Sequence, residues 1–155
     1  MAATVTLGRL FEVLAKMVGN TADNATLLND NLKIVKAAGG AQMPATGTLE
    51  FTLIAKTEAA LRLKEAHLMA QATLAAAAAS RDWQIQYDDG AGGTAVTLTS
   101  LYDGTATAVT AAVRNAMTVT AGVIIPAGSR VYVESTVNST GAAADIQCDA
   151  EFAYE

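Results

Sequence analysis

The sequence predicts an α+β fold in which N-terminal helices precede an antiparallel β-sandwich of the jelly-roll type. In the first half, apolar residues mostly recur every three or four positions, which is the period of an amphipathic helix. After Ser80 they alternate with polar residues, which is the period of a half-buried strand. The 155 residues are enough for one domain with its own core, or for a small domain that carries a helical appendage. We therefore divide the chain into a helical hairpin with a linker (1–47), a possible strand with a long helix (48–80) and the sandwich (81–155).

The first segment is expected to form a helical hairpin. Over residues 6–19, apolar side chains at spacings of three and four make one stripe, which includes Leu7, Leu10, Phe11 and Leu14. A second helix is expected over about 22–38, ended by Gly39 and Gly40. The glycines and the proline of 39–47 then indicate a linker. Because an apolar stripe needs a cover, Leu7, Leu10, Phe11 and Leu14 are the expected contacts with a neighbouring subunit or a larger shell.

The middle segment allows two interpretations at its start. Leu49, Phe51 and Leu53 alternate as in a strand, whereas Glu50 could open the helix that follows; we favour the strand. Residues 56–80 are mostly strong helix formers, and apolar residues lie seven apart through this region, which predicts one long helix. Its alanine-rich end, 75–79, would allow another backbone to approach closely, either within the subunit or between subunits.

The last segment is expected to contain five or six short strands. Alternation begins at Trp83, a glycine-rich turn "DDGAGG" follows, and alternation resumes at Val96. Residues 106–116 fit a helix or a strand, whereas 117–121 favour a strand. In "GVIIPAGSRVYVEST" (122–136), Pro126 and Gly128 predict a corner between two strands. The predicted core contains Trp83, Ile85, Val96, Leu98, Val131, Val133, Ile146 and Phe152.

Composition narrows the classes of partner. The net charge is −5 and Lys and Arg number only 10, so a groove for a nucleic-acid backbone has few residues to build it. No apolar run approaches the ~20 residues of a membrane helix, and charged residues interrupt the N-terminal apolar pattern, so we expect neither a membrane segment nor an export signal. Aromatic residues are only 5%, so the core depends on small and β-branched side chains and would gain from a partner subunit. We expect a homo-oligomer made in the cytoplasm.

Few residues could carry chemistry. His67 is the only histidine and Cys148 the only cysteine, so a Cys-His or Ser-His-Asp arrangement would depend on the fold bringing distant residues together. A zinc site needs about four such ligands, and the loop "GAGG" lacks the residues that follow a phosphate-binding turn. We therefore predict a protein that is not an enzyme and has no cofactor.

Three sets of side chains still have a functional alternative. One set could bind calcium, although aspartate is also common in turns: Asp88, Asp89 and Asp103. A second could form a carboxylate pair, although its alternation favours a solvated strand face: Asp145, Asp149 and Glu151. A third could stack on a sugar, although such residues more often anchor a core: Trp83, Tyr87 and Tyr102. The last set would make the chain a glycan-binding or fibre-like adhesion module.

The composition, rich in Ala, Thr and Gly, and the terminal stretch "TVTAGVIIPAGSRVYVESTVNSTGAAADIQCDAEFAYE" (118–155) resemble small virion proteins of tailed bacteriophages, especially capsid decoration or cement proteins. The likeness covers the last part of the chain in pattern and the whole chain in composition, and it assigns no functional residue. It implies a structural protein of the virion that bridges and stabilises neighbouring capsid subunits.

Overall fold

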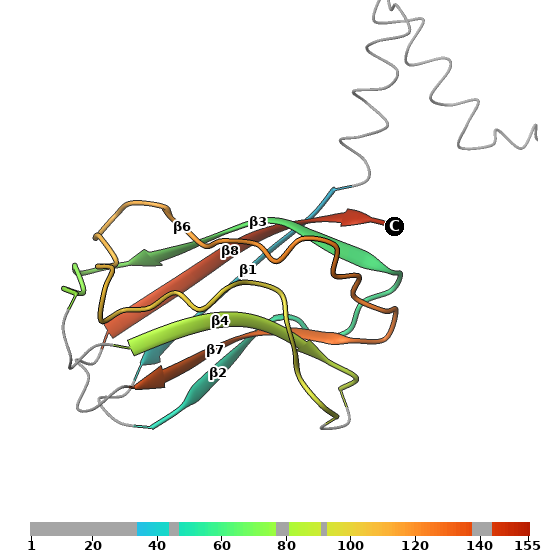
Figure 1. The fold of residues 1–155 in the computed structure, drawn as a ribbon, viewed down its shortest axis with the longest axis horizontal. Helices are drawn as coiled ribbons and strands as arrows, with labels where there is room; N and C mark the ends of the chain where they lie inside the picture. The colour runs from blue at the N-terminus through green and yellow to red at the C-terminus, as the bar shows by residue number, and fades with distance from the viewer. Residues whose placement is uncertain (1–33, 44–46, 77–80, 91–92, 138–143) are drawn as a thin grey trace, which may run out of the picture. The chain divides into compact units, whose positions relative to one another are not determined.

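Two four-stranded antiparallel sheets make up the structure, a computed structural model that describes residues 34–43, 47–76, 81–90, 93–137 and 144–155 (Figure 1). The strands are β1 (Ile34–Met43), β2 (Leu49–Ile54), β3 (Leu61–Ala70), β4 (Arg81–Asp88), β5 (Val96–Thr97), β6 (Asn115–Ala116), β7 (Arg130–Val137) and β8 (Ala144–Tyr154). The first sheet has the order β1-β8-β3-β6 and the second the order β2-β7-β4-β5. Consecutive strands other than β4 and β5 lie in different sheets, so the chain crosses repeatedly between the two layers.

The apolar faces of the two sheets form one core, which confirms the predicted antiparallel sandwich. Seven of the eight predicted core residues are buried: Trp83, Ile85, Leu98, Val131, Val133, Ile146 and Phe152. The eighth prediction is wrong, because Val96 is 37% exposed on the two-residue strand β5. The strand predicted at 48–55 is confirmed as β2, which pairs with β7.

The long helix predicted over 56–80 is wrong. Its centre is β3, which pairs with β8 along its whole length and carries a β-bulge between Leu63 and Glu65. The bulge inserts one residue, so the buried positions change from odd numbers (Leu61, Leu63) to even numbers (Ala66, Leu68). This shift breaks the period of two and creates the helix-like spacing of seven between Leu61 and Leu68.

The helix predicted over 22–38 is wrong at residues 34–38, which belong to β1, and its earlier part lies outside the described residues. The helix predicted over 6–19 lies outside them entirely. The linker predicted over 39–47 is wrong at 39–43, because β1 continues through Gly39 and Gly40 to Met43. A Cβ atom at Gly39 would lie 2.7 Å from the carbonyl oxygen of Thr52, so glycine is needed where β1 packs on β2.

The sandwich therefore takes strands from both sides of residue 81, and Val35–Glu155 form one structural unit. The described ranges contain no helix, and therefore no helix that could cross a membrane. The expected helix or strand over 106–116 is instead an irregular stretch that leads into β6. The predicted corner at Pro126 and Gly128 is confirmed as a turn, with Gly128 at φ 89°, just before β7 begins at Arg130.

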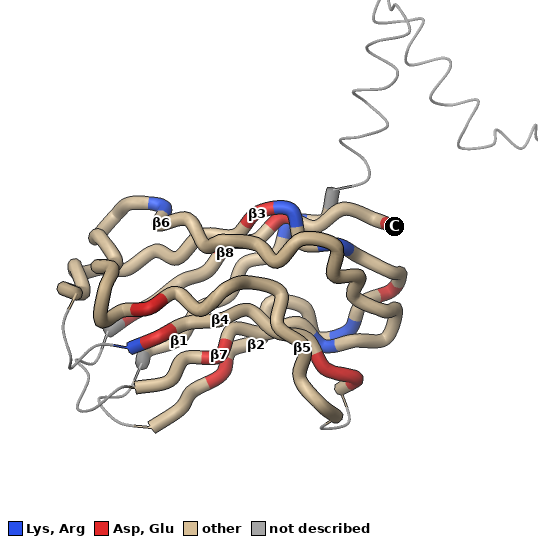
Figure 2. The backbone as a smooth tube through the Cα atoms, viewed as in Figure 1, with Lys and Arg blue, Asp and Glu red and all other residues tan. Residues whose placement is uncertain are grey.

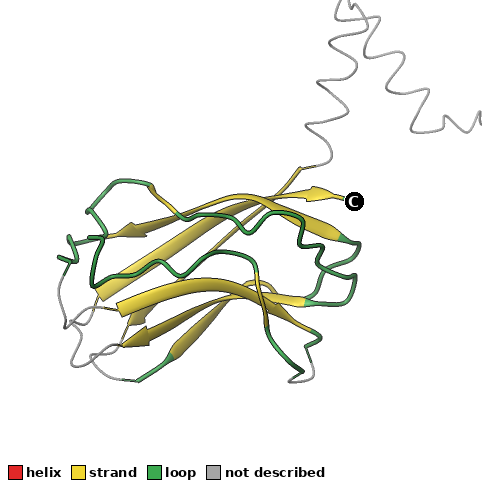
Figure 3. Cartoon of the chain, viewed as in Figure 1, coloured by secondary structure: helices red, strands yellow, loops and turns green. Residues whose placement is uncertain are grey.

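One largely irregular segment, 98–129, which includes the two-residue strand β6, lies along the side of the sandwich where β5 and β6 form the sheet edges (Figure 3). Single bridges connect it to both layers: Leu61 of β3 pairs with Ile125, and Trp83 of β4 pairs with Tyr102. This covering segment shields one side of the core.

Candidate functional site

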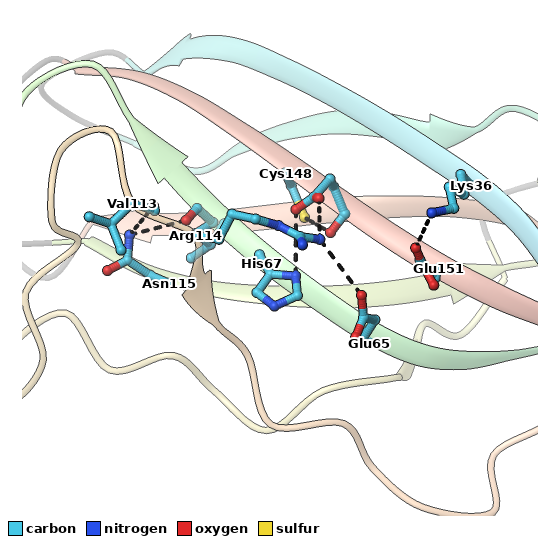
Figure 4. A network of polar contacts seen from close by, with 10 residues as sticks. Lys36, Glu65, His67, Val113, Arg114, Asn115, Cys148 and Glu151 are labelled. Atoms are coloured by element: carbon cyan, nitrogen blue, oxygen red, sulfur yellow. Dashed lines mark hydrogen bonds and ion pairs between the residues drawn. The ribbon is translucent and has the colours of Figure 1, made fainter.

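The outer face of the first sheet carries a charged cluster, which we define as Lys36, Glu65, His67, Arg114, Asp149 and Glu151 (Figure 4). Strand register brings the cluster together. On β3 and β8, Glu65 lies opposite Glu151 and His67 lies opposite Asp149. Because directly opposite residues point to the same face of an antiparallel sheet, these four ionisable groups meet there, although the two members of each opposite pair are more than 80 residues apart in sequence.

Arg114 holds the centre of the cluster. Its Nη2 atom lies 2.6 Å from Oδ2 of Asp149 and 3.7 Å from Oε1 of Glu65. The next residue, Asn115, donates from Nδ2 to the carbonyl oxygens of Val113 and of Leu68 on β3, at 2.8 Å and 3.1 Å. This amide ties the turn to the sheet and so positions the arginine over β3 and β8.

Lys36 of β1 forms the second ion pair, at 2.5 Å from Oε1 of Glu151. The hydrogen bond and the negative charge of Glu151 raise the pKa of Lys36. The lysine side chain is largely exposed, so the pair contributes little to stability. The ion pair instead fixes a position, because it connects the edge strand β1 to β8 in the centre of the sheet.

His67 and Asp149 face one another without a hydrogen bond. His67 Nδ1 lies 3.6 Å from Asp149 Oδ1, which is beyond hydrogen-bonding distance, and both atoms are shielded from solvent with no other partner in the structure. A histidine and a carboxylate could orient a nucleophile, but Cys148 is completely buried on the opposite face of β8. Burial raises the pKa of this thiol to about 12, so the reactive thiolate does not form near neutral pH. The fold does not create the Cys-His pair that the sequence left open.

The three aspartates considered for calcium have separate roles. Asp88 pairs with Arg130 at 2.6 Å and accepts the backbone N–H of Gly90 at 2.8 Å. The hydrogen bond from Arg130 lowers the pKa of Asp88. Asp103 caps its own turn by accepting from Thr105, which lowers the pKa of Asp103, and Asp89 accepts the N–H of Gly93. Within the described residues, no three His, Cys, Asp or Glu side chains form a possible metal site.

The aromatic residues considered for a sugar platform pack in or against the core, the alternative that the sequence favoured. Trp83 is only 1% exposed and packs edge to face against Tyr102, with ring centroids 6.1 Å apart. Tyr87 is half-buried and packs against the same core. Of the carboxylates on β8, Asp149 and Glu151 are ion-paired on a wet sheet face rather than enclosed in a pocket. The contact residues predicted in the first helix, Leu7, Leu10, Phe11 and Leu14, lie outside the described residues.

A second polar network, which no motif in the sequence indicated, lies on the outer face of the second sheet. Gln86 donates to Glu134 and Gln84, and Tyr132 donates to Gln86. The guanidinium of Arg130 lies 4.2 Å from the centre of the Tyr132 ring. The alternating polar positions of β4 and β7 were visible in the sequence, but only the strand pairing shows that they touch.

Lys and Arg lie close to Asp and Glu at several places along the backbone (Figure 2). The ion pairs on the outer faces include Lys36–Glu151, Arg114–Asp149 and Arg130–Asp88. Comparison of the chain with known protein families, with curated proteins and with solved structures finds no match.

Proposed function

We propose that this chain is a non-enzymatic structural protein of a virion, a capsid decoration or cement protein that bridges and stabilises neighbouring capsid subunits. The observation that carries the proposal is the strand order. Two four-stranded sheets ordered β1-β8-β3-β6 and β2-β7-β4-β5, with the chain crossing between them, have the arrangement of a jelly roll. Viral capsid domains commonly use this architecture, so the proposal is supported by analogy with the fold of those domains.

Exposed apolar side chains give the proposal a physical basis. The covering segment carries three of them, and all are about half exposed: Leu101 (55%), Val113 (48%) and Ile124 (51%). A modest contact repeated on every subunit of a closed shell adds through avidity, so a small apolar surface is sufficient. In this proposal Leu7, Leu10, Phe11 and Leu14, which precede the sandwich in sequence, supply a further contact with the shell.

The decisive experiment compares particles assembled with and without the protein. We expect particles that carry it to survive heat or low salt better, and we expect it to lie across the boundaries between capsid subunits. Ile124→Asp should weaken its attachment, whereas Ala121→Asp, at an exposed position in the same segment without a large apolar side chain, serves as the matched control. Equal survival, together with a location that bridges no neighbours, would refute the proposal.

A glycan-binding or fibre-like adhesion module is the alternative, because lectin domains also use the jelly roll. The burial of Trp83 removes the aromatic platform that such a module would have used. Binding to a glycan array by the intact chain would favour this alternative over the cement protein.

A further inference from the structure

The two sides of the sandwich differ in their edge strands. On one side the edges are β5 and β6, of two residues each, and the covering segment lies beside them. On the other side the edges are β1, with ten residues, and β2, with six. A long edge presents unpaired backbone N–H and C=O groups to any other strand, whereas very short edges are a common protection against such pairing. Among the described strands, β1 is therefore the longest one available for pairing.

The sequence of β1 suits close approach by another strand. It contains no proline and a single charged residue, Lys36. The residues on its outer face beyond Lys36 are exposed and include Ala38 and Gly40, so no large side chain obstructs this part of the edge. On the inner face, Val35 and Ala37 pack against the core and hold the strand in place.

Two contacts define how β1 lies on β8. Lys36 pairs with Glu151, and a Cβ at Gly40 would meet Ile146 and Gln147. The two strands are therefore antiparallel, and their register places Gln42 beside the exposed Asp145. The outer face of this edge consequently has a lysine near one end and an aspartate near the other.

We propose that β1 pairs with β1 of a second copy of this chain, antiparallel about a two-fold axis at Ala38 or Gly39, so that the first sheets of two molecules form one continuous sheet. The positions of Lys36 and Asp145 favour a second copy of the chain as the partner and an antiparallel orientation of the two β1 strands. Opposite residues in an antiparallel pair share a face. Lys36 of one copy therefore falls opposite Gly40 of the other if the axis lies at Ala38, or opposite Gln42 if it lies at Gly39, and in both cases it lies towards the end of the other copy's edge that carries Asp145. Parallel pairing in register would instead place the two Lys36 side chains together. The inference concerns self-association and does not rest on attachment to a virion.

Sedimentation of the full chain at micromolar concentration tests this proposal. The wild-type protein should sediment as a dimer. Ala38→Lys places two positive charges near the two-fold axis and should weaken the dimer at least about tenfold. The matched control is Ala116→Lys, an identical change at an exposed alanine on β6, the opposite edge of the same sheet, which should leave the dimer intact.

Cross-linking provides a second readout that does not depend on a disruptive substitution. With a short bismaleimide, Ala38→Cys should give a covalent dimer, whereas Ala116→Cys, on the opposite edge of the sheet, should not. The native Cys148 should not cross-link, because it is buried and unreactive. A monomeric wild-type chain would overturn the proposal and leave the edge to residues 1–33 or to a different protein. A dimer that is unaffected by Ala38→Lys and is not cross-linked through Ala38→Cys would also overturn it.

Discussion

Replacing Phe152 with alanine is the most direct test of the sandwich. Phe152 is completely buried on β8, where it lies opposite Leu63 of β3 in the layer between the two sheets. With only 5% aromatic residues in the chain, this ring fills a volume that the small neighbouring side chains cannot. The substitution should therefore leave a cavity rather than a collapsed core.

The expected loss of unfolding free energy is about 3–5 kcal/mol, because the lost burial of the ring and the cavity both contribute. Domains of this size are stable by about 5–15 kcal/mol, so the loss is a large share of the total. Tyr154→Ala is the matched control, since Tyr154 is an aromatic residue two positions further on the same strand but is 45% exposed. We expect that variant to lose no more than about 1 kcal/mol.

Urea unfolding followed by tryptophan fluorescence measures both losses. Trp83 is the only tryptophan and is almost completely buried, so its emission reports the opening of the core. All variants are compared at one protein concentration, because association would shift the apparent stability. A loss below about 1 kcal/mol for Phe152→Ala, or equal losses for the two variants, would refute the proposed packing.

Three further changes test other parts of the fold. Arg81→Met removes a buried guanidinium that donates to Ser135 on the neighbouring strand β7 and to the carbonyl oxygen of Gly47 just before β2. Urea unfolding should show a loss of about 1–3 kcal/mol, and unchanged stability would mean that desolvation of the charge cancels its hydrogen bonds. Gly39→Ala forces a Cβ against the Thr52 carbonyl and should lower stability by about 1–3 kcal/mol, so an unchanged melting temperature would contradict the close approach of β1 and β2. Because Arg130 lowers the pKa of Asp88 in the folded state, this carboxylate stabilises the protein above about pH 4 and loses its effect as the pH falls through the lowered value. The stability difference between wild type and Asp88→Asn should therefore shrink below about pH 4, and a constant difference from pH 7 to pH 3 would argue against the ion pair.

The sequence predicted β4 and β7, in each of which one face is buried in the core and the other carries polar residues. Trp83 and Ile85 of β4 and Val131 and Val133 of β7 alternate with polar residues, so their periodicity was visible without the structure. The prediction from periodicity failed at β3, where the bulge after Leu63 changed which positions face the core. It failed also at β1, whose alanines and glycines give no contrast between the two faces.

The charged cluster was only partly predictable. His67, Asp149 and Glu151 were recognised as residues capable of chemistry, but the sequence did not show that they share one face with Arg114 and Lys36. That arrangement depends on the register of β3 with β8 and on the turn before β6, which involve residues far apart in the chain.

The sequence by itself determined strands β4, β7 and β8, the predominantly small-residue core and the scarcity of groups able to do chemistry, because these follow from local periodicity and residue counts. The alternation over 117–121 predicted a further strand, which the structure replaces with a single bridge at Val119. Only the tertiary structure decided that 34–43 and 61–70 are strands, since helix-forming residues in 34–38 and 61–70 favoured helices and the glycines of 39–43 favoured a linker. Pairing with β8 supplied the backbone hydrogen bonds and burial that overrode this local preference. Register, a non-local property, likewise decided which charges meet and which strand is left at the edge.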